Sequence, residues 1–263
     1  MKKLGKIYLG LVLLFLYVPI FVLIVFSFNE SKSRSVFSGF TLDWYKKLFQ
    51  NDIIISSLVN TLIIAVAASI ISTILGTLAA IGINNMRKVP KAIVMNITNM
   101  PIINPEIVTG VSLMLLFVFF AARMNLEFGF VTLLIAHITF DVPYVILNIM
   151  PKFIQMDPHL YEAAQDLGCS PFNAFMKVVL PEIMPGVVSG FLMAFTYSLD
   201  DFVISYFTSG STSQTLPVTI YSMTRRKVSP EINALSTIIF AVVVIILIVK
   251  NVIETRQLKK REA

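Results

Sequence analysis

The sequence predicts an all-α polytopic membrane protein with six transmembrane helices. Of its 263 residues, 56% are hydrophobic and only 14% are charged, which is too apolar for a water-soluble chain of this length. Long uncharged runs alternate with short polar segments, and about 20 apolar residues suffice for a helix to cross a bilayer. We therefore expect one transmembrane domain over residues 1–263, with spans at about 7–28, 56–83, 92–121, 129–150, 183–207 and 232–250.

The first two spans are uninterrupted by charge. The run from Ile7 to Phe28 follows three lysines, as in a signal peptide, but it is too long for one and lacks a small-residue cleavage site, so we expect an uncleaved span. The polar segment after it carries Trp44 and Tyr45, which are typical interfacial anchors. The second span contains small residues that would let another helix approach closely, namely Ala65, Ala68, Ser69, Ser72, Gly76 and Ala80.

The third and fourth spans contain prolines and acids. Pro101, Pro105 and Glu106 predict that the third is kinked or partly unwound, because proline removes a helical hydrogen bond. The fourth carries His137, Asp141 and Pro143.

A polar insert at 152–181 separates the fourth and fifth spans and predicts two short amphipathic helices. Asp157 and Pro158 suit the start of the first helix, and Gly168 suits a left-handed turn that ends it. Ser170 and Pro171 then suit the start of the second helix, which Pro181 is expected to close.

Each short helix has an apolar face. One comprises Leu160, Ala163, Ala164 and Leu167, and the other Phe172, Phe175, Met176 and Val179. Glu162, Gln165 and Asp166 form an acidic face on the first helix. We expect its alanine face to be buried by a partner, with the acids at the rim.

The charge distribution predicts that both termini and the 152–181 insert are cytoplasmic. Six spans place both ends on one side of the membrane. That side then holds 13 of the 21 Lys and Arg residues, in the sense of the positive-inside rule.

Four acids fall within the predicted spans, where a carboxylate is costly and usually faces a wet cavity or a partner. Depths follow from a rise of about 1.5 Å per residue. Glu106 lies roughly 22 Å from Lys91, Asp141 roughly 16 Å from Lys152 and Asp200 roughly 27 Å from Glu182, each counted along its span. Asp201 follows Asp200 directly. Since no Lys or Arg lies within these spans, the acids suggest a pathway for a cation. The alternative is that they cap broken helices or sit hydrogen-bonded in the bundle, and for Asp141 this structural interpretation is favoured.

Several kinds of site are not predicted. Cys169 is the single cysteine, and His137 and His159 are too far apart to suggest a metal pair. The basic residues flank apolar runs rather than forming a nucleic-acid patch. No GxxxxGK[ST] string is present, so we expect no cofactor in this chain and assign ATP and Mg²⁺ to a partner.

The insert resembles a known motif. Glu162-Ala163-Ala164, then Gly168, then Val178-Val179-Leu180-Pro181 is similar to the EAA motif of permease subunits of ABC importers. The resemblance implies the type I importer permease fold and a cytoplasmic insert that docks on an ATPase subunit. It assigns coupling to Glu162, Ala163, Ala164, Asp166, Gly168, Leu180 and Pro181.

The resemblance extends over most of the chain. Ser198-Leu199-Asp200-Asp201-Phe202-Val203, 216–223 and 229–234 resemble the PotC-type permeases of spermidine/putrescine transporters, as do Asn29, Trp44-Tyr45, 57–61 and 137–140. The family implies polyamine import in the bacterial inner membrane, with a PotB-type permease as heterodimer partner, two PotA-type ATPases and a PotD-type extracytoplasmic binding protein. The run Arg225-Arg226-Lys227 departs from the family pattern.

Two alternatives remain open from the sequence. An ABC importer for another solute, thiamine-like or ferric ion, would share the docking motif. A stand-alone channel or secondary carrier would need coupling within one chain, and often shows two inverted halves, of which we find no sign. An intramembrane enzyme would need a catalytic motif that the sequence lacks.

Overall fold

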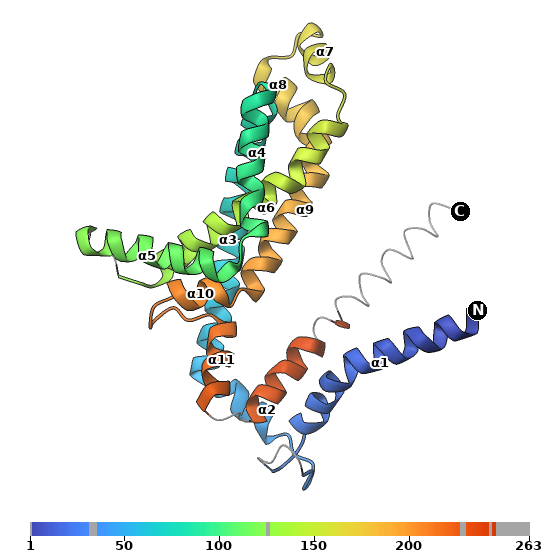
Figure 1. Cartoon of the computed structure of the whole chain (residues 1–263), viewed down its shortest axis with the longest axis vertical. Coiled ribbons are helices and arrows are strands. Elements are labelled where there is room, and N and C mark those ends of the chain that lie inside the picture. Colours follow the sequence, from blue (N-terminus) through green and yellow to red (C-terminus); the bar gives the residue numbers. More distant parts are fainter. Residues whose placement is uncertain (1, 32–35, 125–126, 227–229, 242–243, 246–263) are drawn as a thin grey trace. The chain divides into compact units, whose positions relative to one another are not determined.

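The computed structural model describes residues 2–31, 36–124, 127–226, 230–241 and 244–245. These residues are mostly helical and contain no strand, only an isolated bridge between Asn29 and Phe40. The predicted all-α class is therefore confirmed. The chain divides into two compact units, residues 1–55 with 220–263, and residues 56–219 (Figure 1).

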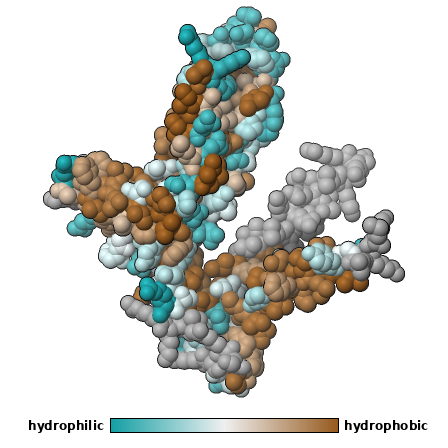
Figure 2. All heavy atoms as spheres, in the orientation of Figure 1, coloured by the Kyte–Doolittle hydropathy of each residue, from teal (hydrophilic) through white to brown (hydrophobic). Residues whose placement is uncertain are grey.

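Among the described residues, five helical stretches are long and apolar enough to cross a membrane: Gly5–Ser27, Asp52–Asn84, Glu106–Arg123, Phe130–Gln155 and Pro171–Asp200. The first two correspond to α1 (Lys2–Ser27) and α3 (Asp52–Asn84), and the next two to α5 (Glu106–Met124) and α6 (Phe130–Gln155). The expected sixth span at 232–250 lies partly outside the described residues. The part of this region that is described, 230–241 and 244–245, is helical. Figure 2 shows hydrophobic side chains over the surfaces of α1 and α5.

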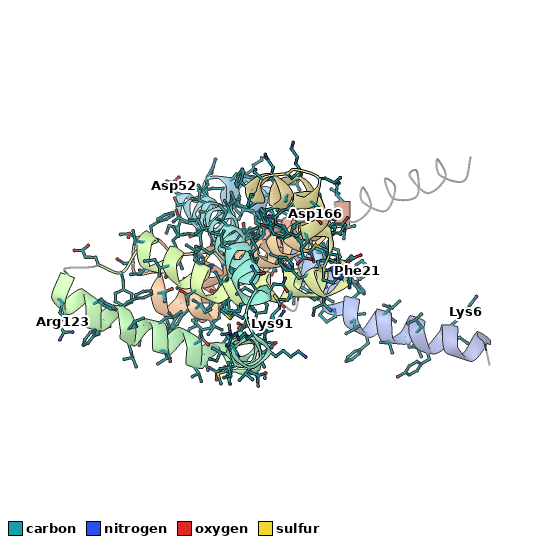
Figure 3. The ribbon with its side chains drawn as sticks, turned by 90° about the horizontal axis from the view of Figure 1, so that it is seen from above. Lys6, Phe21, Asp52, Lys91, Arg123 and Asp166 are labelled. Atoms are coloured by element: carbon teal, nitrogen blue, oxygen red, sulfur yellow. The ribbon has the colours of Figure 1, made fainter. Side chains whose placement is uncertain are left out.

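The expected third span is two helices. α4 (Lys88–Ile103) ends before α5 begins, and Asn104 between them is extended, with ψ 135°. Pro105 explains the break, because the residue before a proline is forced out of the helical region. Glu106 consequently becomes the first residue of a new helix, and Figure 3 shows Arg123 at the other end of α5.

The first unit contains α1, α2 (Asp43–Phe49) and residues 230–241. Asn29 organises the segment after α1: its amide nitrogen donates to the Val36 carbonyl at 2.8 Å and its oxygen accepts from the Ser38 N–H at 2.9 Å. Its own carbonyl accepts from Trp44 Nε1 at 2.7 Å. Trp44 is thus a buried anchor of this segment. By contrast, Phe21 on α1 is 56% exposed.

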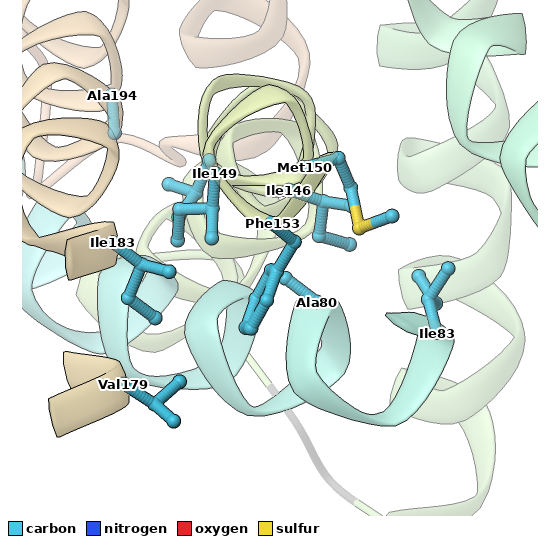
Figure 4. Close-up of a cluster of buried hydrophobic side chains, with 10 residues drawn as sticks. Ala80, Ile83, Ile146, Ile149, Met150, Phe153, Val179, Ile183 and Ala194 are labelled. Carbon is cyan, nitrogen blue, oxygen red and sulfur yellow. The ribbon is translucent and has the colours of Figure 1, made fainter. Parts of the chain in front are cut away.

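The second unit is built on α6 packed against α9 (Leu180–Asp200). Their shared apolar cluster lies near the end of α6, where Ile149, Phe153, Val179 and Ile183 point toward one another and toward Ala80 of α3 (Figure 4). All five side chains are buried. Burial of each large aliphatic side chain contributes about 1.5–3 kcal/mol, so this cluster fixes the two helices where the polar insert begins and ends.

The prediction that Pro181 closes the second short helix is wrong. α8 (Pro171–Ala174) passes into a π-helical turn, η1 (Phe175–Val179), and then into α9 without a break. A proline inside an α-helix removes one hydrogen bond and clashes with the carbonyl four residues earlier, here Lys177. The wider π turn changes that spacing, which explains how the chain continues through Pro181.

The predicted fifth span at 183–207 is also wrong at its far end. α9 ends at Asp200, Asp201 is extended with ψ 123°, and a separate short helix, α10 (Val203–Thr208), follows. The remaining elements are α7 (Leu160–Asp166) in the insert and α11 (Leu216–Arg226).

Small residues on α9 face α6 at a constant register. A Cβ on Gly186 would lie 3.1 Å from the Ile149 Cα, and a Cβ on Gly190 would lie 3.2 Å from the Val145 Cα. Ser198 Oγ meets His137 Nδ1 at 2.5 Å. Each step of four residues on α9 therefore matches four on α6 in the opposite direction. Gly186, Gly190, Ala194 and Ser198 are all buried, as expected for a close helix contact.

We expect Gly186→Leu to prevent close packing of α9 on α6. A Cβ there would lie 2.9 Å from the backbone oxygen of Asn148, which cannot move without shifting α6. The expected cost is about 1–3 kcal/mol, seen as a lower melting temperature in detergent and less protein in the membrane. The matched control is Gly82→Leu, because nothing lies within 4 Å of a Cβ at Gly82. Equal stability of the two variants would contradict this packing.

Candidate functional site

The corner between α7 and α8 is fixed by Gly168. Its φ is +87°, its N–H donates to the Gln165 carbonyl at 2.8 Å, and the Cys169 N–H donates to the Ala164 carbonyl at 3.1 Å. This is the Schellman arrangement, which satisfies the last carbonyls of a helix and favours glycine at the left-handed position. The predicted left-handed turn at Gly168 is confirmed.

The second short helix begins as predicted. The Ser170 side chain accepts from the Asn173 N–H at 3.4 Å, and Pro171 occupies the first turn. The first short helix begins later than predicted, at Leu160. The Asp157 carboxylate instead accepts from the His159 N–H at 2.9 Å, which closes a turn before the helix. Pro158 lies in that turn.

One face of the corner packs on the chain and the other is exposed. Ala164 and Ala174 are buried, and Phe175 and Val179 belong to the cluster on α6. The predicted common face of Leu160, Ala163, Ala164 and Leu167 is therefore divided, since Leu167 is 87% exposed and Ala163 is exposed too.

The exposed face, which we call the corner face, combines Ala163, Leu167 and Phe172 with Glu162 and Asp166. Phe172 is 72% exposed and both acids are exposed. Figure 2 shows hydrophilic side chains gathered at the end of the unit where α7 and α8 lie, and Figure 3 shows Asp166 at this end. Two large apolar side chains flanked by carboxylates suit a groove with an apolar floor and basic edges. Of the other predicted coupling residues, Leu180 is half-buried and Pro181 is exposed at the start of α9.

The four intramembrane acids occupy different environments. Glu106 opens α5 and Asp200 ends α9, and both are exposed. Asp201 is 9% exposed, and Asp141, in the middle of α6, is fully buried. The structure thus separates acids that could meet a solute directly from acids enclosed by the chain.

Asp201 caps the start of α10. Its two carboxylate oxygens accept from the backbone N–H groups of Ile204 at 3.2 Å and Ser205 at 2.6 Å. The free N–H groups at a helix start attract an anion, so the carboxylate stabilises the break after α9. The structural alternative considered from the sequence, that an acid caps a broken helix, is correct for this residue.

His137 connects the three helices that meet at the break. Its Nδ1 lies 2.5 Å from Ser198 Oγ on α9 and its Nε2 lies 3.0 Å from Ser205 Oγ on α10. The same Nε2 lies 3.6 Å from Asp201 Oδ2. All four side chains are buried. A fully bonded polar group inside an apolar bundle holds its partners in one arrangement, so we assign His137 to holding α6, α9 and α10 together.

The contacts of His137 with these two serines are not among the predictions made from the sequence. Ser198 and Ser205 lie 61 and 68 residues from His137 along the chain. A signal was present nonetheless, because Gly186, Gly190, Ala194 and Ser198 recur every four residues, which is the pattern of a small-residue helix interface. That pattern predicts that Ser198 faces a neighbouring helix.

Three aromatic rings lie beside this network. The Tyr144 and Tyr197 ring centroids are 4.5 Å apart, and Phe140 lies 5.1 Å from Tyr144 and 6.2 Å from Tyr197. Phe140 is buried, Tyr144 is half-buried and Tyr197 is exposed. The ring cluster therefore extends from the interior of the unit to its surface.

The residues Arg225 and Arg226 lie at the end of α11. The Arg225 guanidinium lies over the exposed Tyr221 ring at 5.9 Å from its centroid. Lys227, the third member of the predicted basic run, lies outside the described residues.

The chain is similar to permease components of binding-protein-dependent importers. A family model described as "Binding-protein-dependent transport system inner membrane component" matches residues 72–257. The spermidine/putrescine transport system permease protein PotC of Haemophilus influenzae is 38% identical over 239 residues, 91% of each chain. The putrescine transport system permease protein PotI of Escherichia coli K12 is 40% identical over 236 residues, 88% of this chain and 84% of that one.

Two solved structures share the fold. A chain of a bacterial ABC transporter involved in the import of alginate has a TM-score of 0.70 at 14% identity, covering 97% of this chain and 95% of that chain. A chain of a bacterial alginate ABC transporter in complex with its pentasaccharide-bound periplasmic protein has a TM-score of 0.72 at 19% identity, covering 94% and 92%. At these identities the likeness concerns the fold alone.

Proposed function

Since the chain belongs to the family of binding-protein-dependent transport system inner membrane components, we propose that it forms half of the translocation pathway of an ATP-driven importer for polyamines. The observation that carries this proposal is its relatedness, over about nine-tenths of its length, to permeases whose names specify spermidine and putrescine. The chain itself is a membrane permease subunit. Hydrolysis of ATP belongs to partner subunits in this proposal, as do ATP and Mg²⁺.

The corner face is the proposed docking surface for an ATPase subunit. Glu162, Ala163, Ala164, Asp166 and Gly168 build or present it, and Leu180 and Pro181 continue it into α9. Leu167 and Phe172 would fill an apolar floor, while the two acids meet basic groups at its edge. When two ATPase subunits close on ATP, movement of α7 and α8 would be passed to α9, because the helix from Pro171 to Asp200 is continuous.

Asp200 and Glu106 are the proposed cation contacts of the pathway. Both are exposed at helix ends, and among the described residues neither forms an ion pair with a Lys or Arg. A polyamine carries several ammonium groups on a flexible aliphatic chain, so it suits carboxylates near aromatic rings such as Tyr197. A PotB-type permease would supply the other half of the pathway, two PotA-type subunits the ATPase, and a PotD-type protein the loaded solute.

The proposed topology places both termini and the corner in the cytoplasm of a bacterial cell. The half-buried Cys169 makes this testable. A membrane-impermeant maleimide should fail to label Cys169 in intact cells and should label it after permeabilisation. The control is Ser211→Cys in a Cys169→Ser background, because Ser211 is exposed in the segment expected outside. Labelling of Cys169 in intact cells would overturn the topology.

The proposal as a whole is tested with the purified complex. Its ATPase activity should rise when the binding protein is loaded with spermidine or putrescine, and a reconstituted complex should accumulate the same polyamine. Stimulation only by a binding protein loaded with another solute, such as a thiamine-like compound or ferric ion, would replace the polyamine assignment.

A further inference from the structure

We propose that Asp141 is a concealed binding site for an ammonium group of the transported solute, used in a conformation of the transport cycle in which its carboxyl group is uncovered. The inference rests on the proposed function and names a residue that neither the capping of α10 nor the docking corner uses. It is carried by the surroundings of one side chain.

Asp141 is a buried acid to which no described residue donates a hydrogen bond. Its exposed fraction is zero, and neither carboxylate oxygen has a hydrogen-bond partner among the described residues. Burying a carboxyl group without partners costs on the order of several kcal/mol if it is charged, and on the order of 1–3 kcal/mol of lost hydrogen bonding if it is neutral. A structural acid would be expected to recover that cost within the folded chain, as Asp201 does.

The register of the two helices explains why no partner faces it. Val145 meets Gly190 and His137 meets Ser198, so Asp141, halfway between them, faces Ala194. A methyl group offers no donor. One turn along α6, the hydroxyls of Ser198 and Ser205 are already engaged with His137.

The hydroxyl groups of α3 do not donate to Asp141 either. α3 approaches α6 where a Cβ on Gly76 would meet Val145 and the Val142 backbone oxygen. The hydroxyls of α3 around that point, on Ser69, Ser72, Thr73 and Thr77, each donate to a carbonyl of α3 itself. No described residue therefore donates to the carboxylate oxygens of Asp141, and we infer that their donor comes from the solute.

The chemistry of the surroundings points to an alkylammonium group. Such a group brings a positive charge and several N–H donors, and aromatic faces stabilise it further. Tyr144 lies one helical turn beyond Asp141, its ring is 4.5 Å from that of Tyr197, and Tyr197 reaches the surface. A metal ion fits less well, because it needs several protein oxygens or nitrogens, and no group of three or more His, Cys, Asp or Glu that could hold one occurs among the described residues.

The test is Asp141→Asn in the whole reconstituted complex with its ATPase and loaded binding protein. Asparagine is close in shape to a protonated aspartic acid but carries no charge. We expect polyamine uptake to fall at least tenfold, while the melting temperature of the complex is maintained or rises. Wild-type uptake would show that the carboxyl is merely a neutral core group and would overturn the inference. Uptake that falls only in proportion to a lower melting temperature would overturn it as well.

A second variant tests the role of Asp141 while keeping its carboxyl group. Ala194→Ser places a hydroxyl opposite Asp141, where it can donate to the carboxylate and compete with the solute. We expect a higher melting temperature together with reduced uptake, whereas a gain in stability with unchanged uptake would overturn the inference. The wild-type complex separates the two proposals. If it imports no polyamine, the proposed function fails and this inference with it; if it does and both variants match it, only the inference fails.

Discussion

Replacing Gly168 by valine should abolish ATP-driven uptake while leaving the chain in the membrane. The backbone there has φ +87°, and nothing lies within 4 Å of a Cβ at this position, so the substitution acts through conformation and not through collision. A residue with a Cβ costs about 1–2 kcal/mol in the left-handed region, and a β-branched one costs more. Since 1.4 kcal/mol is about tenfold in an equilibrium, the corner would leave its native angle for much of the time.

The matched control is Gly168→Asn, because asparagine enters the left-handed region more readily than other residues with a side chain. We expect it to retain most of the uptake. The measurement pairs polyamine uptake with the amount of ATPase that co-purifies with the permease. Equal uptake by the valine and asparagine variants would show that the left-handed turn has no part in coupling.

Asp201→Ala should destabilise the protein, whereas Asp200→Asn should impair transport alone. Alanine at 201 removes two hydrogen bonds to backbone N–H groups at the start of α10 and leaves His137 without its nearby carboxylate. Bonds to a charged group contribute about 1.5–3 kcal/mol each, so a loss on the order of 3 kcal/mol is expected. This should appear as a lower melting temperature and poor recovery of the complex.

Asp200 is the control for Asp201, because it is the exposed neighbour that ends α9. Asp200→Asn keeps the shape and removes the charge. We expect a normal melting temperature and normal ATPase assembly with polyamine uptake reduced about tenfold. Normal uptake by this variant would remove Asp200 from the proposed pathway, and a stable Asp201→Ala protein would refute the capping role of Asp201.

Local chemistry made the corner predictable from the sequence. The left-handed position at Gly168 and the cap at Ser170 depend on residues within a few positions of each other, and both are found as predicted. The prediction that Pro181 ends a helix fails because it depends on more than neighbouring residues. Whether a proline ends a helix depends on the turn before it, and here that turn is widened where Phe175 and Val179 pack on α6.

The environments of the acids also depend on distant parts of the chain and could not be predicted from the sequence. Asp200 and Asp201 are neighbours of identical type, and only the position of α10 decides that one is exposed and the other is a cap. For Asp141 the sequence favours a structural role, as a helix cap or a hydrogen-bonded group in the bundle. Its isolation follows from the register that places Ala194 opposite it, which depends on segments about 50 residues apart.

The unbroken helix from Pro171 to Asp200 has a mechanical consequence. Its 30 residues correspond to about 45 Å, which exceeds the roughly 30 Å of a hydrocarbon core. One continuous helix therefore joins the proposed docking corner to Asp200, and no relay of side chains is needed between them. Its two ends are a left-handed turn at Gly168 and an extended link at Asp201. A movement of α7 and α8 would therefore displace Asp200 at the other end of this helix. A substitution that restricts the backbone at Gly168 or Asp201 should consequently alter the movement at the opposite end as well.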